Sequence, residues 1–205
     1  MAKKPRYRAP EGEFARLTDE NSFRLSFAPE KKLPVDIGIE LPDGRMQVLV
    51  KRGKSLPFQH NEMYSTASAY QTSVEMHFLV GNRPLAKDNQ TIGRIRLNNI
   101  RWSNQGLPAL DVLVEVRKGT LAIGSNNLDR TRDKGAVSDV CAGLSADDIE
   151  KLLADARDNE ERDAAWQSYI AETDDGRQLI NELADMYAAA KKKMSFSQKR
   201  EHNKM

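Results

Sequence analysis

The chain contains a single cysteine, Cys141, so a fold held together by a framework of disulfides is excluded. No apolar run approaches the roughly 20 residues that a helix needs to span a bilayer. The basic start of the chain is not followed by the apolar stretch of a secretory signal. These absences predict a cytoplasmic protein that does not cross a membrane.

Motifs that carry chemistry are also scarce. No glycine-rich loop is followed by Lys-Ser or Lys-Thr, as phosphate binding of that type requires. The three histidines, His60, His77 and His202, are too scattered to form a metal site with Cys141. We interpret His77 as a hydrogen-bonded structural residue and Cys141 as a small packed side chain. The sequence therefore favours neither an enzyme nor a protein with a metal or cofactor.

The net charge of +2 conceals an uneven distribution. Lysine and arginine dominate both ends of the chain, whereas acidic residues dominate between Asp147 and Asp185. Basic ends can contact phosphates, but Phe196 is the only aromatic residue among the lysines near the C-terminus that could stack on a base. We interpret both ends as solvated segments, and a nucleic-acid partner is not favoured.

Alternating apolar residues predict a series of short strands. The first two flank a Leu-Pro-Asp-Gly turn and are expected to form a hairpin, with Met46, Val48 and Val50 on one face of its second strand. Strands are expected at 35–41, 45–52, 73–81, 92–100, 109–117, 119–125 and 136–141. Short strands joined by tight turns predict a mainly β fold with a two-layer antiparallel sandwich.

After Gly143 the apolar spacing becomes helical. Ser145 is expected to be the N-cap, and Asp148 completes a variant of the capping box. An apolar stripe begins at Ile149 and continues to Tyr187 past a weak point at 174–176. We expect the first turns to dock on the sandwich and the distal stripe to meet a ligand or a second chain. Self-association through the C-terminal helix is therefore left open.

Several segments together resemble the substrate-binding domain of the DnaK-type heat-shock chaperones, the seventy-kilodalton family. They are DIGIE at 36–40, SLP at 55–57, the block at 64–100, GLPALDVLVEV at 106–116 and GLSADDIEKLLADA at 143–156. Their order and spacing hold from about Asp36 to Leu183. The resemblance implies a two-layer β-sandwich followed by a helical lid, which is expected to be truncated.

In that family the corresponding loops and strand form a channel that grips an extended apolar peptide. The resemblance implies that Val74 forms the central pocket, that Pro42 and Ala67 arch over the peptide, and that Ser65 hydrogen-bonds its main chain. The alternative interpretation is that the apolar members of this set are ordinary residues of the sandwich core, and for Met76 taken alone both interpretations fit equally well. The full set of expected peptide-binding residues is Ile39, Pro42, Tyr64, Ser65, Ala67, Val74, Met76 and Leu110.

The expected organisation is a basic, linker-like extension at 1–33, a β-sandwich peptide-binding domain at 34–142, a helical lid segment at 143–190 and a basic tail at 191–205. The family couples this domain to an ATPase domain, which we do not expect within these 205 residues. We therefore expect chaperone-like binding of hydrophobic client segments without intrinsic ATPase activity. An ATPase domain that is separately encoded or missing from this sequence would then be a partner. The sequence is consistent both with a stand-alone protein and with part of a larger chaperone. The alternative is a scaffold or adaptor that binds one dedicated protein through the same fold or its helices.

Overall fold

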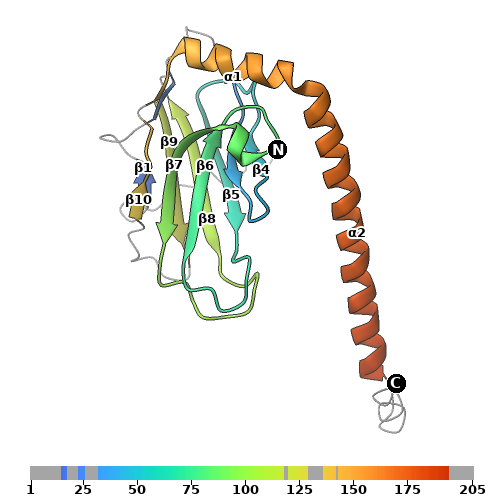
Figure 1. Ribbon diagram of the computed structural model, residues 1–205. Helices are drawn as coiled ribbons and strands as arrows, with labels where there is room; N and C mark the ends of the chain where they lie inside the picture. Colours follow the sequence, from blue (N-terminus) through green and yellow to red (C-terminus); the bar gives the residue numbers. More distant parts are fainter. Residues whose placement is uncertain are drawn as a thin grey trace, which may run out of the picture. The chain divides into compact units, whose positions relative to one another are not determined.

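The computed structural model describes residues 15–17, 23–25, 32–117, 120–128, 136–141 and 143–193. Within these ranges the chain forms two β-sheets and then two α-helices, α1 (Ala146–Asp158) and α2 (Glu160–Lys193) (Figure 1). The chain divides into two compact units between Asp158 and Asn159. The basic ends, at 1–14 and 194–205, lie outside the described residues.

The two sheets form the predicted sandwich. One has the strand order β11-β2-β9-β8-β5, with β1 also paired to β9, and the other has the order β10-β7-β6-β3-β4. All these neighbours are antiparallel except β11 and β2, which run parallel. The strands are β1 (Ala15–Leu17), β2 (Phe23–Leu25), β3 (Ile37–Glu40), β4 (Met46–Val50), β5 (Phe58–Tyr64), β6 (Val74–Val80), β7 (Gln90–Leu97), β8 (Leu110–Arg117), β9 (Thr120–Asn127), β10 (Ala136–Ser138) and β11 (Gly143–Leu144), and the short 3-10 helix η1 (Ala86–Asp88) precedes β7.

A single large core lies between the sheets. In β7, Ile95 and Leu97 are buried while Arg96 is exposed, as the alternation predicts. In β8 the four predicted inward residues, from Leu110 to Val116 at every second position, are all buried. Because the inner faces of both sheets contribute to one cluster, removal of this apolar surface from water is what holds the two layers together.

The β3–β4 hairpin has the predicted position but not the predicted faces. The register shifts within it, so that Val48 and Val50 pair with adjacent residues of β3. Leu49 and Val50 are both buried in the large core, whereas Val48 is exposed and Met46 belongs to a separate small cluster. The expectation that Met46, Val48 and Val50 share one face is therefore wrong, because a β-bulge moves side chains between faces.

Four strands, β1, β2, β5 and the two-residue β11, were not expected from the sequence. β5 pairs with β8 along its whole length, although its sequence is polar and its residues are only half-buried or exposed. β1 and β2 pair with β9 and lie inside 1–33, the segment expected to be a linker-like extension. Three residues are too few to show a periodicity, so these short strands are defined by their pairing, β1 with β9 and β2 with both β9 and β11.

The predicted capping box at the start of α1 is confirmed. The backbone N–H of Asp148 donates to the Ser145 hydroxyl (3.1 Å), and the backbone N–H of Ser145 donates to the Asp148 carboxylate (3.1 Å). The Ser145 hydroxyl also donates to that carboxylate, at 2.6 Å. Two of the amides that a helix start leaves without partners are thereby satisfied.

We expect the start of α1 to lose stability at acid pH. The hydrogen bond from the Ser145 hydroxyl, followed by that from its backbone N–H, holds the pKa of Asp148 below its usual value. Because the folded-state pKa is depressed, the stabilisation is complete above the unfolded pKa of about 3.9 and is lost as the pH falls through the folded value. An NMR titration of the Asp148 carboxyl should show a midpoint that moves upward in Ser145→Ala. Equal midpoints in both proteins would contradict the assignment.

Helix α1 belongs to the sandwich unit. Ile149 is buried in the core, and Leu152 and Leu153 pack against it. Arg83, whose side chain is almost fully buried, forms an ion pair with Asp155 at 2.6 Å. The boundary between the compact units falls after Asp158, because α1 shares the core of the strands. The expected division between 142 and 143, where strands give way to helices, stays a prediction.

Helix α2 is continuous from Glu160 to Lys193, so the predicted weak point at 174–176 does not interrupt it. The interruption lies at Asn159, whose carbonyl accepts a hydrogen bond from the Asp163 N–H at 2.9 Å. One internal glycine costs a helix only about 1 kcal/mol relative to alanine, which a long helix tolerates. Among the described residues, no helix is long and apolar enough to cross a membrane.

Candidate functional site

A cavity of about 450 Å³ lies beside the ends of β3, β5 and β6. Seven of the eight residues expected to contact a peptide line it, and Leu110 does not. Six further residues complete the lining. The whole set is Ile39, Glu40, Leu41, Pro42, Tyr64, Ser65, Ala67, Gln71, Val74, Glu75, Met76, His77 and Arg94.

The apolar wall of the cavity comes from the two neighbouring strands β3 and β6. Ile39 and Met76 point toward the core and are almost fully buried, whereas Val74, the first residue of β6, is only half-buried. The Ser125 hydroxyl of β9 donates a hydrogen bond to the Met76 sulfur at 3.2 Å, which ties this wall to the opposite sheet. Val74 is therefore the member of this wall that a ligand can reach with the least rearrangement.

Leu110 is separated from the cavity by its burial. It is the first residue of β8, pairs with Tyr64 of β5 and is 0% exposed. Its side chain lies in the main core between the two sheets. The backbone of Leu110 is thus paired with a residue that lines the cavity, but Leu110 itself does not line it.

Pro42 and Ala67 line the cavity from two different connections and are both exposed. Pro42 lies in the β3–β4 turn, where the Gly44 N–H donates to the Leu41 carbonyl at 2.9 Å. Arg45 also contacts Asp43 in this turn, at 2.7 Å. Ala67 lies in the loop that joins β5 to β6. The two residues expected to arch over a peptide thus belong to connections that both border the cavity.

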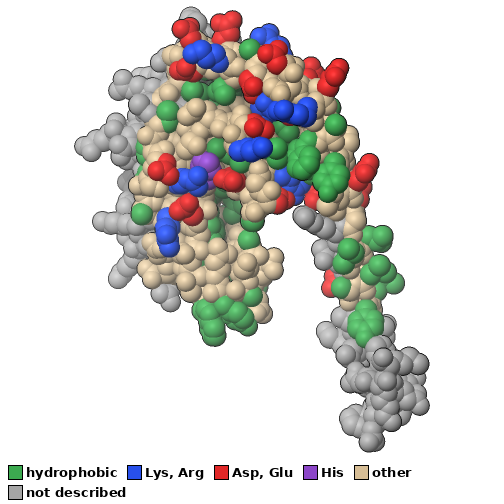
Figure 2. Space-filling view, in the orientation of Figure 1, with side chains coloured by type: hydrophobic (Ala, Val, Ile, Leu, Met, Phe, Trp, Pro, Cys, Tyr) green, Lys and Arg blue, Asp and Glu red, His purple; other side chains and the backbone are tan. Residues whose placement is uncertain are grey.

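The loop that carries Ala67 is held by the loop that follows β7. The Tyr70 N–H donates to the Ser103 carbonyl at 2.8 Å, and the Ile100 N–H donates to the Thr72 carbonyl at 3.0 Å. The rings of Tyr70 and Trp102 also meet, with centroids 4.6 Å apart. Both loops lie at the same end of the sandwich, where hydrophobic side chains gather (Figures 1 and 2). No local pattern in the sequence relates these two distant aromatic residues.

Two hydroxyls next to the cavity differ in their partners. The Ser65 hydroxyl donates to the Pro108 carbonyl at 2.5 Å, so its proton is already engaged and only its oxygen lone pairs remain for a ligand. The Tyr64 hydroxyl is buried and has no hydrogen-bond partner among the described residues. Burial, with a smaller contribution from Glu62, raises the pKa of Tyr64, so its hydroxyl stays protonated and can donate.

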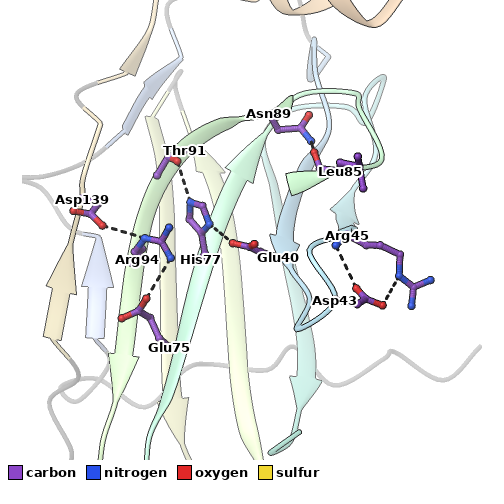
Figure 3. A network of polar contacts seen from close by, with 10 residues as sticks. All are labelled: Glu40, Asp43, Arg45, Glu75, His77, Leu85, Asn89, Thr91, Arg94 and Asp139. Atoms are coloured by element: carbon purple, nitrogen blue, oxygen red, sulfur yellow. Dashed lines mark hydrogen bonds and ion pairs between the residues drawn. The ribbon is translucent and has the colours of Figure 1, made fainter. Parts of the chain in front are cut away.

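The polar lining lies on the outward face of the second sheet (Figure 3). His77 contacts the Glu40 carboxylate at 2.5 Å and the Thr91 hydroxyl at 2.9 Å, which confirms its interpretation as a hydrogen-bonded residue. Arg94 forms ion pairs with Glu75 at 3.2 Å and with Asp139 at 3.0 Å. Sequence reasoning did not assign these groups to a site, because alternation places them opposite the apolar wall.

The cavity therefore combines an apolar wall, two exposed connections and paired polar groups. Apolar walls with a few polar groups beside them are typical of sites that hold a ligand in a fixed orientation. Within the described ranges, no group of three or more His, Cys, Asp or Glu residues is placed to hold a metal. A family model described as "Hsp70 protein" matches residues 30–205, which include every residue of the cavity lining.

Proposed function

The chain belongs to the Hsp70 protein family, and from this premise we propose that its cavity binds extended apolar segments of client proteins. The observation that carries the proposal is that one cavity of about 450 Å³ is lined by seven of the residues that the family resemblance implied would contact a peptide. Full burial of a leucine side chain contributes about 1.5–3 kcal/mol. Val74 and the apolar wall behind it provide a surface for such a side chain.

An extended peptide also brings amide groups that need hydrogen-bond partners when they leave water. The protonated Tyr64 hydroxyl is a donor without a partner among the described residues, and Tyr64 is one of the residues that line the cavity. The remaining lone pairs of Ser65 and the backbone of the two exposed connections provide acceptors and donors. These groups can bind the main chain of a peptide whatever its amino-acid sequence is. In this proposal the cavity selects one apolar side chain and accepts varied sequences around it.

A panel of labelled peptides tests the function. Peptides with a central leucine should bind the purified chain, and matched peptides with aspartate at that position should not. Binding to many leucine-centred sequences supports the client-binding function. No binding across the panel, together with one stoichiometric protein partner, would instead support the adaptor alternative, for which the exposed apolar residues of α2 provide a surface.

We also expect the chain to bind no ATP, although the family includes ATPases. The reason is that the sequence contains no glycine-rich phosphate loop followed by Lys-Ser or Lys-Thr. Calorimetric titration with Mg-ATP should give only the heat of dilution, with a nucleotide-binding protein as a positive control. A saturable heat would contradict this prediction. The cytoplasmic location and the need for a separate ATPase stay predictions of the same proposal.

A further inference from the structure

Helix α2 carries an apolar stripe with the repeat of a coiled coil. Six of its residues follow one another at alternating spacings of three and four positions: Trp166, Tyr169, Thr173, Gly176, Ile180 and Leu183. That spacing places them on one seam of the helix. Trp166 is 39% exposed and Ile180 is 66% exposed, and Figure 2 shows hydrophobic side chains along this helix. Exposure of several large apolar side chains on one element indicates a surface that contacts another molecule.

Gly176 adds a second observation. It lies near the middle of α2, and a methyl group added to it would meet no atom within 4 Å. Its backbone is helical, so neither its conformation nor its described neighbours require a glycine. Glycine is also less favourable than alanine in the interior of a helix. A position of this kind in the seam is explained if another helix packs closely there.

The charges of α2 indicate which helix that is. Residues 160–176 contain six acidic residues and one basic residue, whereas residues 177–193 contain four basic residues and two acidic ones. Two copies placed side by side in the same direction would bring the two acidic halves together. Two copies in opposite directions bring each acidic half beside a basic half, and their helix dipoles also oppose favourably.

We propose that α2 pairs with the α2 of a second copy of this chain as an antiparallel coiled coil. The seam residues then interdigitate with Gly176 opposite Ile180 and Thr173 opposite Leu183, so each small side chain faces a large one. The helix of 34 residues is about 50 Å long, which is enough for several such layers. This proposal does not depend on peptide binding by the sandwich.

Sedimentation of the full chain at increasing concentration tests the pairing. The parent protein should form a dimer, and Ile180→Glu/Leu183→Glu, which places charges in the seam, should sediment as a monomer. The matched control is Ala164→Glu/Ala171→Glu, which adds the same charges at exposed positions of α2 outside the seam and should remain a dimer. Dissociation of the control as readily as the seam variant would overturn the proposal. A parent that is monomeric at every concentration would also overturn it.

Hydrogen exchange identifies what covers the seam. In the proposed dimer, amides around Gly176 should gain protection as the protein concentration rises. If the seam instead packs on the sandwich of its own chain, a monomer would show strong protection that does not depend on concentration, and the proposal would fail.

Cysteine cross-linking tests the direction of the pair and does not require the seam variant to fold. In a Cys141→Ser background, an oxidised mixture of Thr173→Cys and Leu183→Cys chains should give a disulfide-linked dimer of one chain of each kind. Neither single variant should cross-link efficiently alone, because identical positions lie apart in an antiparallel pair. Efficient cross-linking of each variant with itself would show a parallel pair and overturn the proposal.

Discussion

Val74→Phe should remove most of the affinity for a leucine-centred peptide and leave the melting temperature close to that of the parent. Val74 begins β6, is half-buried and lines the cavity, so a larger ring can occupy the space meant for the ligand. Phenylalanine is also a good strand former. A micromolar affinity in the parent corresponds to about 8 kcal/mol, and fluorescence anisotropy with a labelled peptide measures how much of it is lost.

The matched control for this prediction is Val112→Phe. Val112 is buried in the core and does not line the cavity, so the same enlargement should destabilise the protein by about 1–3 kcal/mol through overpacking. Melting curves and peptide binding should be measured on the same preparations. A stable Val74→Phe protein that binds peptide as tightly as the parent would remove Val74 from the proposed site. Destabilisation of both variants to the same degree would place Val74 in the closed core.

Leu110→Ala should have the opposite result, with a large loss of stability and no direct loss of peptide affinity. Leu110 is 0% exposed and packs between the sheets outside the cavity lining. Truncation of such a leucine removes buried apolar surface and leaves a cavity, at a cost of about 2–5 kcal/mol. Urea unfolding gives the change in free energy, and the peptide affinity should be measured where the variant is still folded.

Leu107→Ala provides the control for Leu110→Ala, because the same side chain is removed close by in the sequence. Leu107 is 67% exposed, so its truncation should change the free energy of unfolding by less than about 0.5 kcal/mol. A selective loss of peptide affinity in folded Leu110→Ala would return Leu110 to the binding surface. That result would support the original expectation from the family resemblance.

Features that depend on neighbouring residues in the chain were predictable. The alternation in β8 identified its buried residues from Leu110 to Val116, because successive side chains of a strand point to opposite faces. The capping box between Ser145 and Asp148 was predictable for the same reason, since both partners lie within one helical turn. The family resemblance then supplied seven residues that share one cavity, and their role in binding stays a prediction.

Features that depend on distant residues were missed or misplaced. β5 has little apolar character of its own, and its strand state follows from its pairing with β8. The bulge in the β3–β4 hairpin separates Val48, which is exposed, from Val50, which is buried. The contacts of Glu40 with His77 and of Tyr70 with Trp102 each join residues from different strands or loops. No local periodicity encodes such contacts.

The amino-acid sequence by itself determined that a set of regular strands is followed by helices, which residues of those strands point inward and where α1 starts, because these follow from local backbone geometry and side-chain spacing. The tertiary structure alone decided which of those residues meet at the cavity. Ile39 and Leu110 are both apolar strand residues, yet one lines the cavity and the other is enclosed by the two sheets. That difference depends on how the strand ends and loops of separate segments are placed in space, which spacing along the chain does not specify.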